Sequence, residues 1–259
     1  MELILDNLTY KDNKLDNKLN NISYTFKDGI TFVSGLNVCL LKQILFNEEQ
    51  ANDGFIYLSE KASKKDIYLV SNTNNFHEDN LYDELIYINK YYHLNYNNFN
   101  QRVINSLKMA GLSQVYLNED YSVLSYTVLK KINLVLALFI NPKILIFDYY
   151  DKQMSNKDIE YFKKLVYKLN KMYNKNIIVS SNNIENYLSI LTNIVIFDKG
   201  KIVFEGTNED LYDNKIYKYI DEPNIISFIK YLDKKNHKFD NYIDIKELLK
   251  AIYRDVENK

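Results

Sequence analysis

The stretch NPKILIFD, residues 141–148, places four apolar residues directly before an aspartate. Two further runs of the same kind, at residues 67–70 and 176–179, are separated from it by segments of helical period. Strands that are apolar on both faces are typical of a parallel sheet covered by helices. We therefore predict a buried parallel sheet in which Asp148 ends one of the strands.

Shorter segments rich in β-branched and aromatic residues predict further strands. They lie at residues 22–26, 30–33, 55–58, 194–197 and 202–204. The sequence predicts two hairpins, over residues 20–33 and 194–204, that turn at a KDG at 27–29 and a DKG at 198–200. The predicted fold class is therefore α/β, with a mixed sheet that carries an antiparallel arm.

The region from about residue 80 to 141 carries no strand signal and repeats apolar residues at helical spacing instead. Helices are expected at residues 82–92, 99–110 and 124–140, and after Gly206 at about 224–234 and 244–253. We therefore predict one domain at residues 1–208 that contains this helical insertion, followed by a C-terminal helical extension at 209–259.

Composition excludes several classes of function. Among 259 residues, 33 Lys and Arg oppose 34 Asp and Glu, and the net charge of -1 argues against a nucleic-acid partner. Cys39 is the single cysteine, so neither an intrachain disulfide nor a cysteine metal cluster is expected. The histidines, His77, His93 and His237, lack the spacing of a metal motif. We predict no metal site.

The longest apolar run, residues 134–140, is too short to cross a bilayer. The beginning of the chain lacks the basic and apolar regions of a signal peptide. We expect a cytoplasmic protein that reaches the inner face of a membrane, if at all, through a partner.

The order of these segments resembles that of ABC-type ATPase subunits: a strand, a loop at Gly35, a helix, a helical insertion and then residues 141–148. LSYTV, at 124–128, lies where that family has its LSGGQ signature. DKGKIVFEGT, at 198–207, is similar to the hairpin after the family's switch histidine. The resemblance covers nearly the whole chain and implies a P-loop NTPase-like core.

The C-terminal tail resembles the extension of the energy-coupling-factor (cobalt- and vitamin-type) transporter ATPases. The resemblance rests on YIDEP at 219–223, on Ile225, Phe228 and Leu232, and on IKELL at 245–249. In that subfamily the extension helps two ATPase subunits to stay paired. It implies a dimer with a second ABC ATPase subunit or with a second copy, and a generic helical cap is the alternative.

The phosphate-binding loop of that family is largely replaced. A P-loop, GxxxxGK[ST], binds phosphate because its glycines admit close backbone N–H groups and its lysine neutralises charge. The aligned stretch GLNVCLLK, residues 35–42, keeps only Gly35 and has Leu41 at the lysine position and Lys42 at the hydroxyl position. A shift by one residue would let Lys42 act as the lysine without restoring the glycines. We expect no cofactor, with residual Mg-ATP binding as the alternative.

The hydrolytic positions implied by the resemblance have changed as well. Asp148 stands where the family has its magnesium-associated aspartate, but Tyr149 replaces the glutamate that polarises water. A phenol cannot act as that base near neutral pH. Asn182 stands at the switch-histidine position. No catalytic residue is therefore predicted.

The resemblance implies two further remnants of a nucleotide site, one before the helical insertion and one within it. Asn72 holds the Q-loop position, and Ser125 remains in the signature, where Tyr126 and Thr127 replace the glycines. Purely structural roles are the alternative for the retained polar residues: Asp148 as the cap of the following turn, and Ser125 as the cap of the next helix.

These losses together predict a pseudo-ATPase that pairs with another ABC subunit and a membrane component in energy-coupled transport. In the family, a groove between core and helical domain receives a helix of the membrane protein. Phe76, Leu81 and Tyr82 are the candidate contacts there, unless they pack the insertion against the core. Because both the P-loop and the signature are altered, the alternative is a homodimeric structural or regulatory protein on the same scaffold. A working ATPase with unorthodox ligands ranks last.

Overall fold

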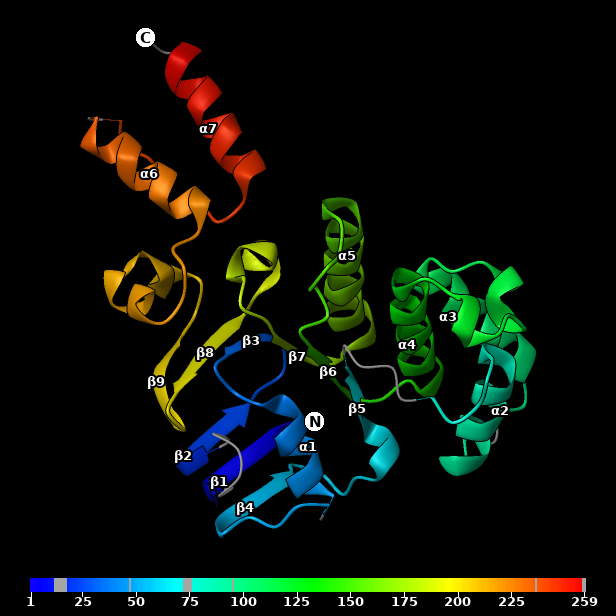
Figure 1. The fold of residues 1–259 in the computed structure, drawn as a ribbon. Coiled ribbons are helices and arrows are strands. Elements are labelled where there is room, and N and C mark those ends of the chain that lie inside the picture. The colour runs from blue at the N-terminus through cyan, green and yellow to red at the C-terminus, as the bar shows by residue number, and fades with distance from the viewer. Residues whose placement is uncertain (12–17, 47, 72–75, 95, 236, 258–259) are drawn as a thin grey trace.

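The computed structural model describes residues 1–11, 18–46, 48–71, 76–94, 96–235 and 237–257, and its strands form two sheets (Figure 1). The smaller sheet is antiparallel and has the order β2 (Lys18–Phe26), β1 (Leu3–Lys11), β4 (Asp53–Leu58). The larger has the order β5 (Ile67–Val70), β6 (Ile144–Asp148), β7 (Asn176–Ser180), β3 (Ile30–Ser34), β8 (Asn193–Asp198), β9 (Lys201–Gly206).

The larger sheet confirms the α/β class with a mixed sheet. Its strands are parallel from β5 to β8, and only β9 runs antiparallel, paired with β8 through the turn at residues 199–200. In the register, Ser180 lies opposite both Asp148 and Val33. The carboxyl ends of β6, β7 and β3 therefore meet at one edge of the sheet, which is where a ligand site forms in α/β proteins.

The hairpin predicted over residues 20–33 is wrong. β2 pairs with β1 in the smaller sheet, whereas β3 lies between β7 and β8 in the larger one. All five residues of β3 are buried, which suits a central parallel strand and not the arm of a hairpin. The prediction also missed β1, whose buried side chains, such as Leu3 and Leu5, alternate along the strand.

The helices surround the larger sheet and build the insertion (Figure 1). Their bounds are α1 (Val38–Leu45), α2 (Leu81–Tyr91), α3 (Phe99–Ala110), α4 (Tyr126–Ile140), α5 (Asn156–Tyr173), α6 (Asn224–Lys234) and α7 (Ile245–Glu257). Short 3-10 turns lie at Lys64–Asp66, Gln114–Leu117, Tyr121–Val123, Ile184–Asn186, Leu188–Ile190, Glu209–Tyr212 and Asn214–Lys218. Two predicted helices, 99–110 and 224–234, have these bounds, and the other three of the insertion and the tail differ from them by one to four residues.

Alternate side chains of the central strands point to opposite faces of the sheet and belong to two separate hydrophobic cores. Phe32 and Phe147 face the larger core, which contains α4, α5 and the insertion. Val33 and Ile146 face the smaller core, beneath α1 and the three-stranded sheet. The tail packs onto the larger core through buried apolar residues that include Ile226. Among the described residues, no helix is both long and apolar enough to span a membrane.

Candidate functional site

The chain leaves β3 through Gly35, which has a left-handed backbone with φ +73. A Cβ atom built there would lie 1.9 Å from the carbonyl oxygen of Phe197 in β8. Glycine is the residue that combines this conformation with such a close approach to backbone. Packing against β8 therefore accounts for the one glycine that the loop keeps.

Asn37 closes the amino-terminal end of α1. Its Oδ1 accepts hydrogen bonds from the backbone N–H groups of Cys39, at 3.1 Å, and Leu40, at 3.2 Å. These are N–H groups of the kind that bind an anion at the start of a helix. The chain's own side chain satisfies them instead, as an N-cap does.

Leucine side chains around this cap point into the protein. Leu36 and Leu40 are buried, and Leu41 has no exposed surface. Leu41 belongs to the smaller core together with Val33 and Ile146. The position that a P-loop lysine would hold is therefore part of the apolar interior, and the residues present do not fit a nucleotide phosphate.

Lys42 follows Leu41, but its side chain lies on the surface of a groove and not in the smaller core. Its ammonium group lies 5.9 Å from the centre of the Tyr68 ring. Both side chains line a groove between α1, β5 and α2. The lining of this groove includes Cys39 but neither Gly35 nor Asp148.

Asp148 and Tyr149 lie at the end of β6, at the edge where the three strands finish. Burial raises the pKa of the Asp148 carboxyl. Tyr149 has a left-handed backbone with φ +47, and its N–H donates to the carbonyl oxygen of Ser180 at 2.9 Å. Burial raises the pKa of the Tyr149 phenol, which moves it further from the range of a general base.

A buried hydrogen-bonded cluster fixes the loop that follows Tyr149. Asp151 Oδ2 accepts hydrogen bonds from Ser181 Oγ and Asn186 Nδ2, both at 2.8 Å. Asp151 and Ser181 are buried, whereas Asn182, at the switch-histidine position, is exposed. The buried contacts between these two loops are therefore structural and leave Asn182 outside them.

Lys130 ties α4 to the same loop. Its Nζ donates to the carbonyl oxygens of Tyr150, at 2.8 Å, and Lys152, while the Tyr150 hydroxyl donates to the carbonyl oxygen of Lys130 at 3.0 Å. Lys130 is only 2% exposed. Burial lowers the pKa of its ammonium group to about 8, with Asp151 opposing and Lys152 adding to the shift.

The lowered pKa of Lys130 predicts a pH-dependent stability. Between the folded pKa of about 8 and the ordinary value of 10.5, the unfolded chain binds more protons than the folded one. The free energy of unfolding therefore gains a contribution as pH rises through this window. We expect urea unfolding of the wild type to gain stability relative to Lys130→Met from pH 7.5 to 10. Parallel pH profiles of the two proteins would contradict this assignment.

Serine residues hold the N-cap positions of α5 and α4, the two helices that flank this loop. Ser155 caps α5, and its Oγ accepts from the N–H of Asp158 at 3.2 Å. Ser125 holds the N-cap position of α4 but makes no side-chain cap hydrogen bond. Asn72, the Q-loop position, lies outside the described residues.

The candidate partner contacts differ in exposure. Leu81 is fully buried and has no surface to offer a partner. Phe76 packs on Tyr121 with ring centres 4.2 Å apart. Tyr82 is 38% exposed and meets Phe99 edge to face. Of the three, Tyr82 presents the largest surface to solvent.

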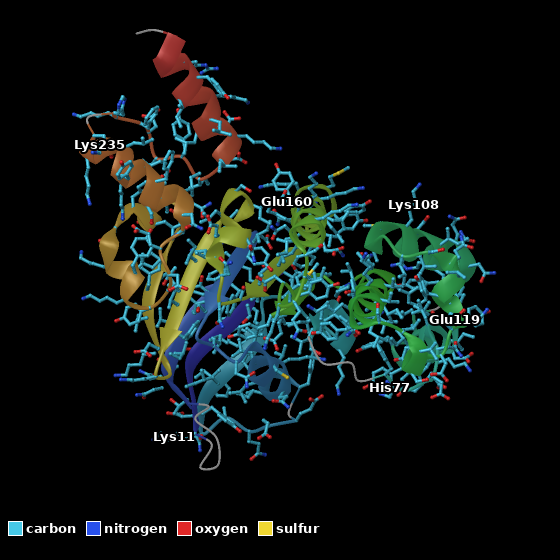
Figure 2. All side chains as sticks on the ribbon, turned by 45° about the horizontal axis from the view of Figure 1, so that its top comes forward. Lys11, His77, Lys108, Glu119, Glu160 and Lys235 are labelled. Carbon is cyan, nitrogen blue, oxygen red and sulfur yellow. The ribbon has the colours of Figure 1, made fainter. Side chains whose placement is uncertain are left out.

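The groove beside Lys42 has a volume of about 370 Å³ and a wall of aromatic rings from α2. His77 stacks on Tyr87 at 4.4 Å between ring centres, and Tyr87 stacks on Tyr91 at 6.0 Å. The buried Glu84 holds the start of this wall, because its Oε2 accepts from the N–H groups of His77, at 2.8 Å, and Glu78, at 2.9 Å. Figure 2 labels Glu119 on the helical insertion and His77, which precedes α2.

The structure brings Gly35, Leu41 and Asp148 to the same region of the fold. At the start of α1, however, the Asn37 side chain takes the place where the loop of a phosphate site would present its N–H groups. Sequence reasoning missed Asn37, Asp151 and Lys130. Asn37 carried a signal, since an asparagine directly before an apolar helix is typical of an N-cap. No three His, Cys, Asp or Glu side chains form a metal-ligating group within the part of the chain that the structure describes.

This arrangement of two sheets and a helical insertion is the fold of ABC transporter ATPase domains. One similar solved structure is that of cbiO1 from Clostridium perfringens, part of the ABC transporter complex cbiONQ. It has a TM-score of 0.67 at 18% identity over 88% of this chain and 98% of that one.

Two other solved structures share the fold. The ATP-binding cassette MJ0796, solved as a dimer with ADP and Pi, has a TM-score of 0.64 at 18% identity and covers 80% of this chain and 98% of that one. A bacterial Atm1-family ABC exporter with ATP bound has a TM-score of 0.68 at 15% identity over 83% of this chain and 40% of that one. No protein-family model and no curated protein sequence matches this chain.

Proposed function

We propose that this chain is a non-hydrolysing subunit on the ABC ATPase fold, which pairs with another such subunit and docks a membrane component in energy-coupled transport. One observation carries the proposal: Asn37 occupies the first N–H groups of α1 while Leu41 fills the core at the lysine position. The N–H groups of Cys39 and Leu40 are then occupied, and the cation of α1, Lys42, lies beside Tyr68 and not at position 41. With Tyr149 and the exposed Asn182 at the hydrolytic positions, a bound nucleotide would also lack a general base to activate the attacking water.

The groove beside α2 supports the docking role. It lies between the core and the helical insertion, and its tyrosine rings offer a large apolar surface with polar tips. The similar structures include a part of a transporter complex and a dimeric cassette. These likenesses support a paired subunit that works beside a membrane component.

The second candidate is a homodimeric structural or regulatory protein with no transport role. It is favoured by the altered signature, because Tyr126 and Thr127 would impair the site that this chain completes for a partner. A gene for a transmembrane subunit next to the gene of this chain would favour transport. Isolation from such genes would favour the scaffold.

The test is a thermal melt with and without millimolar Mg-ATP or Mg-ADP. A ligand at about 100 times its dissociation constant adds roughly 2.7 kcal/mol and raises the melting temperature of a chain of this size by several degrees. We expect no shift with either nucleotide. An ABC ATPase with an intact P-loop serves as the positive control.

A clear shift with Mg-ATP that Asp148→Ala removes would overturn the account of the loop before α1 as closed to phosphate, which is the observation that carries the proposal. It would place a nucleotide at the end of β6 despite the Asn37 cap. Hydrolysis would then have to be measured directly.

A further inference from the structure

Strand β4 leaves one side of its backbone without a partner. It pairs only with β1, and the N–H of Ser59 donates to the carbonyl oxygen of Glu2 at 3.0 Å. Hydrogen-bonded pairs alternate along an antiparallel ladder, so Tyr57 and Phe55 bond to β1 while Ile56 and Leu58 face the open edge. Among the described residues no second strand pairs with β4, which lies at the edge of the smaller sheet (Figure 1).

The outward face of this strand is aromatic. Phe55 is 71% exposed and Tyr57 is 44% exposed. Edge strands of soluble proteins are usually protected by charges, proline or bulges, because an open apolar edge pairs with other strands. Residues 55–58 contain no charged residue and no proline.

A groove runs beside the inward face of the same edge. Its volume is about 410 Å³, and it lies between residues 56–58 of β4, Leu45 and Phe46 of the α1 region, and the segment after β4 that includes Ala62 and Lys64. A strand added to β4 would place alternate side chains in this groove and the others beside Phe55 and Tyr57.

Charges at the two ends of β4 favour a second copy of this chain as the added strand. Exposed acids, Glu48, Glu49 and Asp53, precede the apolar part of the strand, and exposed lysines, Lys61, Lys64 and Lys65, follow it. Glu60, at the basic end, pairs with Lys143 at 3.2 Å. Two copies of β4 that run antiparallel bring the acidic end of each to the basic end of the other. Such a two-fold interface is complementary to itself.

We propose that two copies of this chain pair edge to edge through β4, antiparallel about a two-fold axis at Ile56. In this register Ile56 lies opposite Ile56 of the partner subunit as a hydrogen-bonded pair. Phe55 lies opposite Tyr57 of the partner subunit as a non-hydrogen-bonded pair, where side chains are closest and aromatic pairs stabilise a sheet. The two smaller sheets then form one continuous sheet. This inference does not depend on the proposed function.

The test is a disulfide at the axis. In a Cys39→Ser background, Ile56→Cys places two thiols on Cα atoms about 5.5 Å apart, which suits a disulfide. Leu58→Cys is the matched control, because two Leu58 positions lie about 14 Å apart in this register. After mild oxidation we expect a covalent dimer with Ile56→Cys and almost none with Leu58→Cys, on a non-reducing gel.

Equal cross-linking by both variants, or by neither, would overturn the proposal, provided that both melt as the parent does. A second variant tests the surface itself. Adding Phe55→Lys to Ile56→Cys puts like charges on both copies at a position that is already exposed, and should lower the cross-linked fraction about tenfold. Val115→Lys, at another exposed apolar position, should leave it unchanged. Cross-linking that survives Phe55→Lys would contradict the edge interface.

Discussion

Restoring the missing lysine by Leu41→Lys is expected to destabilise the protein by about 3–5 kcal/mol and to give no ATP binding. Leu41 has no exposed surface and lies among apolar side chains of the smaller core. An ammonium group among these buried apolar side chains would lose its hydration, and burying a charge in such surroundings is costly. Urea unfolding measures the loss.

Leu41→Met is the matched control for this change. It keeps an apolar side chain of similar volume and should cost less than about 1.5 kcal/mol. A Leu41→Lys protein as stable as the control, with a melting temperature that rises in Mg-ATP, would contradict the assignment. It would mean that position 41 can turn towards a phosphate site after all.

Much of the fold could be predicted because buried strands and helices have characteristic apolar patterns in the sequence. The runs at residues 67–70, 143–147 and 176–179 are apolar apart from Lys143 and Asn176, since helices cover one face of the sheet and α1 with the smaller sheet covers the other. All three are strands. The error at residues 20–33 has a physical cause. A short KDG link between two strands fits a hairpin, but β2 and β3 find their partners in distant parts of the chain.

The candidate site was less predictable because its contacts are formed between distant segments. Leu41, Tyr149 and Asn182 can be recognised from the sequence as departures from the motifs that the resemblance implies. That Lys130 would be buried against the loop at 150–152 carried no sequence signal, since a lysine in a helix is usually exposed. The role of Asp151 likewise depends on Ser181, thirty residues away.

The order of strands and helices matches that of ABC transporter ATPase domains, and Asn37 and Leu41, which follow β3, act as a helix cap and a core residue. A fold is maintained by packing over its whole volume, whereas an activity depends on a few side chains. Gly35 can be explained either by packing against β8 or by the needs of a phosphate site. The two explanations predict different losses of stability when Gly35 is replaced in the absence of nucleotide.

Replacing Gly35 by alanine is expected to destabilise the protein by about 3–5 kcal/mol even without any nucleotide. The added Cβ would lie 1.9 Å from the Phe197 carbonyl oxygen, and this neighbour is backbone within β8. It cannot move without disturbing the pairing of β8 with β3. Equilibrium unfolding in urea, with no ligand present, measures the effect.

Gly111→Ala separates the steric effect from backbone strain. Gly111 also has a left-handed backbone, with φ +66, but its Cβ would meet the side chain of Tyr161 at 3.3 Å. That neighbour is a side chain 43% exposed at the surface, so the cost should be only the strain of about 1–2 kcal/mol. Equal losses in the two variants would remove the packing explanation for Gly35. A larger loss at Gly35 would mean that this glycine is kept by contact with β8 and needs no phosphate to explain it.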